Sequence, residues 1–346
     1  MNEKTVLLMD IGGTHCRAKI VQGPEGLFDS TSVKVSRMEK ITDKQSFFKF
    51  ITEMIVTGSG AVRPDYAVLC FAGPVIRESV SMFNWTGDRE IGLAELIHAG
   101  LPESGISLLN DMEAAAFGLI ACRKGKSVLD EVVLYQGSGM KEPRNDNSVL
   151  MIPGTGIGVS AIVDMEQPGS GREWQALGCE LQHTPIPVLN QEHYVVMNRM
   201  KTRLSIDNPT WEDFVSGRGL ENIYSCLVAE GIQVTPLPAA EIAGRAVAGS
   251  DGLCKTALDM FYQCCGALAQ VLALVFQPYG GIRLAGESTR KNYASIPGGP
   301  FLGQLHDNEV RADLLMQFPV YLVRSELNLD GAAYAADRYL RYQNSV

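Results

Sequence analysis

The most constraining feature of the 346-residue chain is one pattern that occurs twice: a β-rich run, a turn with glycine and threonine, and a second β-rich run. The first copy spans Thr5 to Val21 and turns at Asp10-Ile-Gly-Gly-Thr14. The second copy spans Ser148 to Val163 and turns at Gly154-Thr-Gly-Ile-Gly158. Such an internal repeat predicts two related halves, and the alternation of strands and helices around it predicts α/β domains.

Both turns are candidate phosphate sites, because glycines let backbone amides approach an anion closely and a threonine adds a hydroxyl donor. An ordinary Gly-Gly hairpin turn is the alternative for the first copy. The second copy does not match a dinucleotide fingerprint, because its third glycine comes only two places after the second and β-formers follow instead of a helix. A hairpin turn whose amides hold phosphate oxygens is the interpretation that we favour there.

The stretch around Asn110 and Asp111 joins a short apolar run, Ile106 to Leu109, to an alanine-rich segment with helical spacing, Met112 to Cys122. Asp111 thus falls at a strand end and a helix start, where the unpaired amides of the first turn favour an anion. One interpretation is a plain helix N-cap. The other makes Asp111 a general base, with Asn110 positioning a polar ligand beside it.

Two further segments place carboxylates where they can serve a ligand. A loop bounded by glycine and proline sets Glu180 and His183 three residues apart. Hydrogen bonding to a polyhydroxyl ligand suits this pair, and a metal site is a weak alternative because a third ligand is missing from the motif. Glu212 falls in the first turn of a predicted helix that Asn208 or Thr210 caps, and by itself it is typical of a solvated first-turn acid.

Charge and composition exclude several classes of function. The formal net charge is −9 with acidic and basic residues mixed throughout, so nucleic acid and an anionic membrane are poor partner candidates. The most apolar run, Cys264 to Phe276, is too short to span a bilayer, and the first residues carry no secretory signal, which favours a cytoplasmic protein. Eight cysteines without Cys-x-x-Cys pairs indicate reduced core thiols rather than disulfides or a zinc site.

Six motifs, taken together and in order, resemble those of bacterial glucokinase, a family of the hexokinase and actin ATPase superfamily. They cover nearly the whole chain: Asp10-x-Gly-Gly-Thr14, Leu109-Asn-Asp111, Gly154-Thr-Gly-x-Gly158, Glu180-x-x-His183, Glu212-x-x-x-Ser-Gly217 and Gly280-Gly-Ile-x-x-Ala-Gly286. The resemblance implies an α/β fold with two duplicated actin/hexokinase-like (ribonuclease H-like) domains flanking a cleft. It also implies a small domain at residues 1–110, on which a C-terminal helix at about 331–346 packs back, and a large domain at 111–330.

The resemblance further implies a role for each motif. The sugar site would consist of Asn110, Asp111, Glu180, His183 and Glu212. Asp111 would be the base that accepts the proton of the sugar's 6-hydroxyl. The nucleotide site would consist of Gly12, Gly13, Thr14, Gly154, Thr155 and Gly156 around the ATP phosphates, Gly281 and Gly286 near adenosine, and Asp10 holding Mg²⁺ through water.

The expected activity is therefore ATP-dependent phosphorylation of glucose to glucose 6-phosphate, and the resemblance alone implies a homodimer. Two alternatives stay open: a kinase of another hexose or an amino sugar on the same scaffold, and a sugar sensor without catalysis. Three positions depart from the usual family pattern. Leu181-Gln182 stand in place of Gly-Gly between the glutamate and the histidine, His15 stands in place of an asparagine, and Glu287 in place of a glycine.

Overall fold

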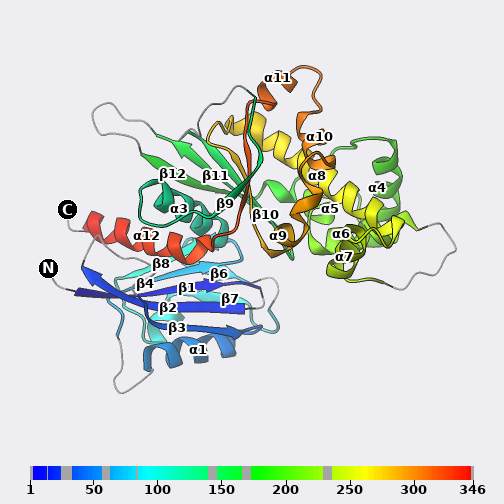
Figure 1. Ribbon diagram of the computed structural model, residues 1–346. Coiled ribbons are helices and arrows are strands. Elements are labelled where there is room, and N and C mark those ends of the chain that lie inside the picture. The colour runs from blue at the N-terminus through cyan, green and yellow to red at the C-terminus, as the bar shows by residue number, and fades with distance from the viewer. Residues whose placement is uncertain are drawn as a thin grey trace. The chain divides into compact units, whose positions relative to one another are not determined.

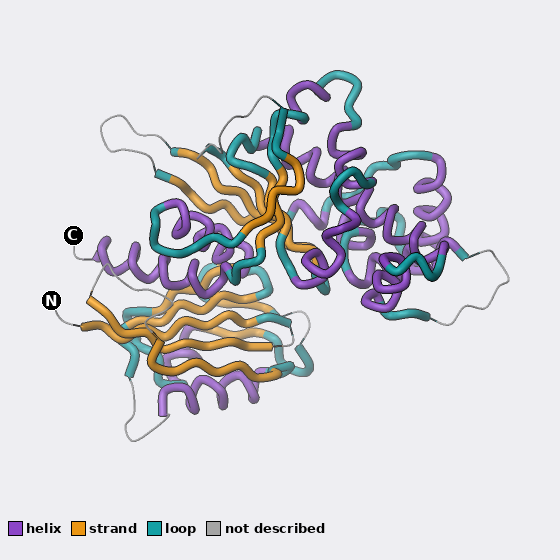
Figure 2. The backbone as a smooth tube through the Cα atoms, viewed as in Figure 1, coloured by secondary structure: helices purple, strands orange, loops and turns teal. Residues whose placement is uncertain are grey.

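The computed structural model describes residues 3–13, 15–24, 33–56, 63–82, 85–138, 146–165, 173–228 and 236–343. The chain forms two compact units, which Figure 1 shows in one view. Unit 1 comprises Met1–Leu129 and Ser325–Val346, and unit 2 comprises Asp130–Arg324. Each unit contains a mixed β-sheet and helices, as the tube in Figure 2 makes plain. The α/β class expected from the sequence is confirmed.

Unit 1 is built on a sheet with the strand order β3-β2-β1-β4-β8 and a smaller antiparallel sheet of β5, β6 and β7. The strands of the main sheet are β1 Glu3–Ile11, β2 His15–Pro24, β3 Val33–Lys40, β4 Tyr66–Phe71 and β8 Ile106–Asn110. Those of the smaller sheet are β5 Val75–Ile76, β6 Ser79–Ser81 and β7 Glu90–Gly92. The helices are α1 Lys44–Val56, α2 Leu93–His98, α3 Asp111–Arg123 and α12 Leu327–Gln343.

Both faces of the main sheet of unit 1 are covered, because successive residues of a strand point to opposite sides. Leu7 and Met9 of β1 enter a core that includes residues of α1, whereas Val6 and Leu8 enter a second core that includes residues of α12. All four are fully buried. Asp10, the next residue on the α12 side, is therefore a carboxylate at the end of an apolar strand.

Helices α3 and α12 of unit 1 pack closely because each carries a glycine where the other passes. A Cβ atom at Gly331 would lie 1.8 Å from the carbonyl oxygen of Ala114, and one at Gly118 would lie 2.3 Å from that of Leu327. This packing makes α3 part of unit 1. The two units consequently divide between residues 129 and 130, and not between 110 and 111 as the motifs led us to expect.

Unit 2 is built on a sheet with the strand order β12-β11-β10-β13-β14-β9. The strands are β9 Glu131–Tyr135, β10 Ser148–Pro153, β11 Ile157–Asp164, β12 Trp174–Cys179, β13 Ile282–Leu284 and β14 Val320–Val323. The 3-10 helices are η1 Leu181–His183 and η2 Tyr293–Ser295. The α-helices are α4 Gln191–Leu204, α5 Trp211–Phe214, α6 Gly217–Leu227, α7 Ala239–Val247, α8 Gly252–Phe276, α9 Glu287–Asn292, α10 Pro300–His306 and α11 Ala312–Leu315.

The two main sheets repeat one order of strands. In unit 1, β1, β2 and β3 form an antiparallel meander, and β4 and β8 continue in parallel on the other side of β1. In unit 2, β10, β11 and β12 form the meander, and β13 and β14 continue in parallel beside β10. Strand β9 is an antiparallel addition at the edge. The shared order confirms the duplication inferred from the two hairpins.

Helix α8 is the longest element of the unit 2 core, where Leu258, Leu268 and Leu272 are almost completely buried. Of the helices in the described part of the chain, it alone has the length and apolar composition to cross a membrane, but most of that stretch is buried within the unit. Burial of this extent is typical of a core helix.

The eight cysteines are free thiols, six of them buried and two, Cys122 and Cys179, half-buried. Burial raises the pKa of the Cys264 and Cys265 thiols well above the ordinary value. Both thiols therefore stay protonated and weakly nucleophilic at neutral pH. This agrees with the prediction of reduced core thiols.

We expect Gly331→Ala to lower the free energy of unfolding by about 3 kcal/mol, since the new methyl group overlaps a carbonyl oxygen of a packed helix and α12 must move. Gly244→Ala is the matched control, because Gly244 is a helical glycine in α7 with open space around it. That variant should gain about 0.5 to 1 kcal/mol from helix propensity. Equal effects of the two substitutions in urea titrations contradict the close packing of α3 and α12.

We also expect acid to destabilise unit 2 through His193 of α4. The side chain is completely buried, its Nδ1 accepts from the Leu189 amide at 3.2 Å, and burial lowers its pKa from 6.5 to about 4. As the pH falls from 6.5 to 4, this histidine binds a proton in the unfolded chain but not in the folded one, so the free energy of unfolding falls by about 3 kcal/mol. His193→Gln should remove this fall. An identical pH dependence of unfolding in wild type and variant contradicts the role of His193.

Candidate active site

Asp10 is the last residue but one of β1 and is itself only 6% exposed. Arg17 lies opposite it on β2 and donates from Nε and Nη2 to Asp10 Oδ2. Asn328, at the start of α12, donates from Nδ2 to Asp10 Oδ1 at 2.9 Å. Arg17 also forms an ion pair with Glu326. The charge of this carboxylate is thus balanced by a guanidinium, as the burial of an ion requires.

The turn after β1 is closed by its own backbone, since the Gly12 amide donates to the His15 carbonyl oxygen at 2.9 Å. Gly12 and Gly13 are partly exposed. Thr14, the threonine of the expected phosphate turn, lies outside the described residues. The described part of this turn therefore presents the backbone of two glycines next to the buried carboxylate of Asp10.

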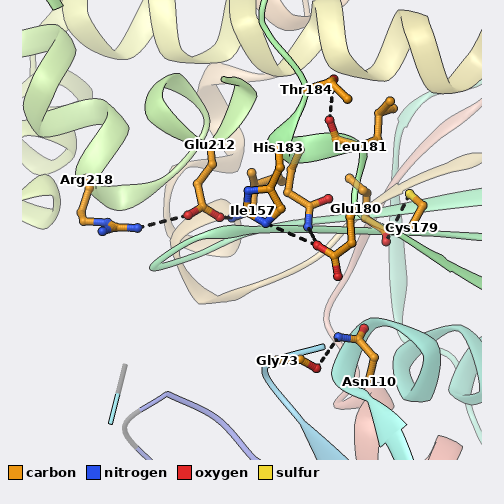
Figure 3. Close-up of polar contacts among 12 residues, drawn as sticks. Gly73, Asn110, Ile157, Cys179, Glu180, Leu181, His183, Thr184, Glu212 and Arg218 are labelled. Carbon is orange, nitrogen blue, oxygen red and sulfur yellow. Dashed lines mark hydrogen bonds and ion pairs between the residues drawn. The ribbon is translucent and has the colours of Figure 1, made fainter. Parts of the chain in front are cut away.

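Asn110 is the N-cap of α3. Its Oδ1 accepts from the Met112 amide at 2.9 Å, and its Nδ2 donates to the Gly73 carbonyl oxygen at 3.2 Å, the contact drawn in Figure 3. The N-cap interpretation of the sequence thus applies to Asn110. Asp111 is left as the first residue of the helix, where it is half-exposed and where a helix N-terminus stabilises a carboxylate.

Asp10 near the end of β1 and Asp111 just after β8 lie at the same edge of the unit 1 sheet. Strands β1, β4 and β8 are parallel, and their register aligns Asp10 with Cys70 and Cys70 with Leu109. Burial raises the pKa of the Cys70 thiol, and the charges of Asp10 and Asp111 raise it further. Ligands of open α/β sheets bind beyond the carboxyl ends of parallel strands, which is the edge that both aspartates occupy.

The second glycine turn lies between β10 and β11 in unit 2, where the Gly154 amide donates to the Gly156 carbonyl oxygen at 2.7 Å. Two neighbouring segments fix its position. The Gly217 amide at the start of α6 donates to the Gly154 carbonyl oxygen at 2.8 Å. The Ser288 hydroxyl at the start of α9 donates to the Pro153 carbonyl oxygen at 2.9 Å. The tip of the turn stays exposed while its base is held by two helices.

The two glycines expected near adenosine lie at opposite ends of β13. Gly286 follows the carboxyl end, and a Cβ atom on it would lie 3.2 Å from the Pro153 carbonyl oxygen, so it adjoins the β10–β11 turn. Gly281 precedes the amino end, accepts from the Val149 amide and packs against the Tyr321 ring. Because the intervening strand spans about 10 Å, the structure does not bring Gly281 to the turn.

Glu180 is the N-cap and His183 the last residue of η1, a single 3-10 turn after β12. The pairing of β12 with β11 aligns Cys179 with Val159 and so carries Glu180 toward the glycine turn. Glu180 Oε2 lies 3.3 Å from His183 Nε2, and the two side chains are 58% and 56% exposed (Figure 3). Gln182 Nε2 donates to the same Oε2 at 2.6 Å. The glutamate is therefore open to solvent yet oriented by its neighbours.

Glu212 is the second residue of α5, whose N-cap is Thr210. Its carboxylate reaches over the β10–β11 turn, where Oε2 accepts from the Ile157 amide at 3.4 Å. A Cβ atom at Gly156 would lie 2.7 Å from this oxygen. Arg218 Nη2 donates to the other oxygen, Oε1, at 3.1 Å, as Figure 3 shows. The carboxylate expected to meet a sugar thus borders the turn expected to meet phosphates.

Backbone hydrogen bonds connect the loop after η1 to the start of α5. The Ile186 amide donates to the Pro209 carbonyl oxygen at 3.0 Å, and the Trp211 amide donates to the Thr184 carbonyl oxygen at 3.3 Å. The segments that carry the two glutamates are therefore parts of one backbone framework. Unit 2 gathers its three expected sugar ligands beside the glycine turn.

Several contacts of these site residues were not recognised from the sequence. The contact of Arg17 with Asp10 could have been predicted, because pairing across the first hairpin sets residue 17 opposite Asp10. No sequence pattern predicts the contact of Asn328, since it lies 318 residues from Asp10 along the chain. Gln182 and Arg218 stand beside motif residues, but their spacing does not indicate which carboxylate each of them binds.

Asp10 is the residue to test for magnesium. The described residues contain no group of three His, Cys, Asp or Glu side chains that could hold a metal ion. Mg²⁺ bound with a nucleotide usually keeps several waters and takes phosphate oxygens with one or two carboxylates. Each oxygen of Asp10 retains acceptor capacity for water beside its protein donors. The residues present therefore fit a hydrated ion held through water, and not an ion held by protein ligands alone.

Comparisons with known proteins agree with this geometry. A model of the family described as Glucokinase matches residues 7–339. Glucokinase of Mesorhizobium japonicum is 30% identical over 338 residues, which cover 95% of this chain and 91% of that protein. Among solved structures, glucokinase from Balamuthia mandrillaris in complex with glucose shares the fold with a TM-score of 0.80 at 19% identity, over 97% of this chain and 94% of that one. A ROK family glucokinase from Streptomyces griseus in complex with glucose and AMPPNP gives a TM-score of 0.58 at 19% identity, over 96% and 98%. The chain belongs to the glucokinase family.

Proposed function

We propose that the protein transfers the γ-phosphoryl group of ATP to the 6-hydroxyl of glucose. The observation that carries this proposal is the gathering of Glu180, His183 and Glu212 beside the β10–β11 turn in unit 2. Two carboxylates and an imidazole can satisfy several vicinal hydroxyls, and each charge-assisted hydrogen bond contributes about 1.5–3 kcal/mol. Membership of the glucokinase family supports glucose as the sugar.

Asp111 is the general base in this proposal. Its carboxylate accepts the proton of the 6-hydroxyl while that oxygen attacks the γ-phosphorus, and the leaving group is ADP. The Asn110 oxygen caps α3, and one of its two amide protons bonds to the Gly73 carbonyl oxygen. The second amide proton is then left for a sugar hydroxyl.

The ATP phosphates bind to the backbone of the two turns, 12–14 and 154–156, and Gly286 borders the nucleotide. Backbone amides and threonine hydroxyls at such turns are donors for phosphate oxygens. Asp10 would hold Mg²⁺ through water, and the ion would supply charge neutralisation at the phosphates. Phosphoryl transfer asks chiefly for in-line positioning and neutralised charge, which these donors serve. Gly281 has no part in this assignment, since it lies at the far end of β13.

We further propose a cytoplasmic homodimer. ATP and a reducing environment are available in the cytoplasm, and eight free thiols suit that compartment. The dimer rests on the family resemblance. Nucleic acid and membrane take no part, in keeping with a net charge of −9 that is spread over mixed acidic and basic residues.

Side-by-side phosphorylation assays with glucose, mannose, fructose and N-acetylglucosamine test the proposal. We expect glucose to have the highest kcat/KM. Turnover of another hexose or of the amino sugar without turnover of glucose assigns the chain to a different substrate. Binding of a sugar without any turnover identifies a sensor.

Asp111→Asn should lower kcat by about 10²- to 10⁴-fold, because the amide keeps the shape of the side chain but accepts no proton. Glucose affinity, measured by calorimetry, should change much less. Glu113→Gln is the matched control on the same helix and should keep its turnover. Near-normal kcat in Asp111→Asn removes this residue as the base.

Glu180→Ala should raise the KM for glucose by about tenfold or more while kcat changes less, because the lost hydrogen bonds are made to the bound sugar. The control is Glu192→Ala, which removes an exposed glutamate from the first turn of α4 in the same unit. A KM that Glu180→Ala leaves unchanged contradicts the role of this residue in sugar binding.

A further inference from the structure

Gln182 is a buried residue between two exposed ones. It is the middle residue of η1 and is only 7% exposed, whereas the side chains of Glu180 and His183 are both more than half exposed. Its Nε2 donates to Glu180 Oε2 at 2.6 Å. His183 Nε2 lies 3.3 Å from that same oxygen. One oxygen of Glu180 therefore accepts from the Gln182 amide and lies beside the His183 ring.

The other end of the Gln182 amide is unfavourably placed. Its Oε1 is buried and has no hydrogen-bond partner among the described residues. Turning the amide over would exchange the two ends, but it would direct the oxygen at the Glu180 carboxylate and lose the donor. A buried polar atom without a partner costs stability, which an apolar side chain of the same length avoids. The packing of unit 2 thus gives no reason for an amide here.

We propose that Gln182 is a positioning residue for sugar recognition, a role that rests on the proposed function and deepens it. The amide fixes the Glu180 carboxylate with Oε2 turned to the protein, so that Oε1 is the oxygen presented to a ligand hydroxyl. The hydrogen bond between Gln182 and Glu180 leaves Gln182 Oε1 buried without a partner. Stability is thus lost where function gains, as active sites often show.

The fixed carboxylate determines which sugars are accepted. A carboxylate free to rotate about its last bond can follow a hydroxyl that has changed its direction. One held by the Gln182 amide, with the His183 ring against the same oxygen, offers a single oxygen in a single direction, so a sugar with the inverted hydroxyl leaves it unpaired. Gln182 therefore sharpens the discrimination between glucose and the epimer that differs at the hydroxyl read by Glu180.

Gln182→Met tests the proposal, because methionine matches the length of glutamine and has no amide. We expect a melting temperature that is unchanged or higher, since the unpaired acceptor is removed. The KM and the Kd for glucose should rise by about tenfold, with kcat nearly unchanged. The preference in kcat/KM for glucose over mannose, allose and galactose should fall, most strongly for one epimer, which identifies the hydroxyl that Glu180 binds.

Gln182→Glu allows a second measurement, the pH dependence of sugar affinity, which a purely structural role of Gln182 would not change. Two carboxylates share this contact only when one of them is protonated, so sugar affinity should weaken as the pH rises from about 5 to 8. Gln175→Met should keep the pH profile of the wild type, from which Gln182→Glu departs. Gln175→Met is the matched control, because Gln175 on β12 bonds to the Ala176 carbonyl oxygen and to no site residue in the described part of the chain.

A lower melting temperature of Gln182→Met, with KM, Kd and epimer preference unchanged, overturns the proposal and makes Gln182 a structural residue. The proposed function is tested separately by the wild type. If the wild type binds glucose but does not phosphorylate it, the kinase assignment fails while the Kd comparison still decides the role of Gln182. If the wild type binds none of the four sugars, both proposals fail.

Discussion

The close approach of the Glu212 carboxylate to the β10–β11 turn is the contact on which the site in unit 2 depends. A side chain at position 156 would come within 2.7 Å of Glu212 Oε2, so the contact requires a glycine there. The two oxygens of the carboxylate then meet the Ile157 amide and the Arg218 guanidinium. A group suited to sugar hydroxyls is thereby held at a turn suited to phosphates, which is the juxtaposition that a sugar kinase needs.

The two halves of the chain share a strand order but not the chemistry of their turns. In unit 1 the hairpin turn follows Asp10, a buried carboxylate neutralised by Arg17. In unit 2 the equivalent strand, β10, ends in Pro153, whose carbonyl oxygen accepts from Ser288. The carboxylate at the turn after it is that of Glu212, which comes from helix α5. Duplication thus supplies two similar frameworks, and the polar residues at the ends of their strands differ between the two units.

The sequence predicted the hairpins, the strand before Asp111 and the helix after it, because each depends on neighbours a few residues apart. It did not reveal the meander-edge strands β3 and β12. The side chains of 35–40 in β3 alternate between half-buried and exposed, so the apolar signal of this edge strand is weak. Gly281 marks another limit: it shares a motif with Gly286, but the spacing of a motif does not tell which end of a strand a ligand meets.

The sequence by itself determined the duplicated hairpins and the α/β class, because these follow from residue type and spacing along the chain. The resemblance of its motifs to those of a family then added the candidate residues Asp111, Glu180 and Glu212. Only the tertiary structure decided which groups hold the carboxylates: Asn328 on Asp10, Gln182 on Glu180 and Arg218 on Glu212. The physical reason is that a hydrogen bond between side chains depends on a distance of about 3 Å in space. That distance depends on the strand register and the helix packing of the whole core. It cannot be read from the separation of two residues along the chain.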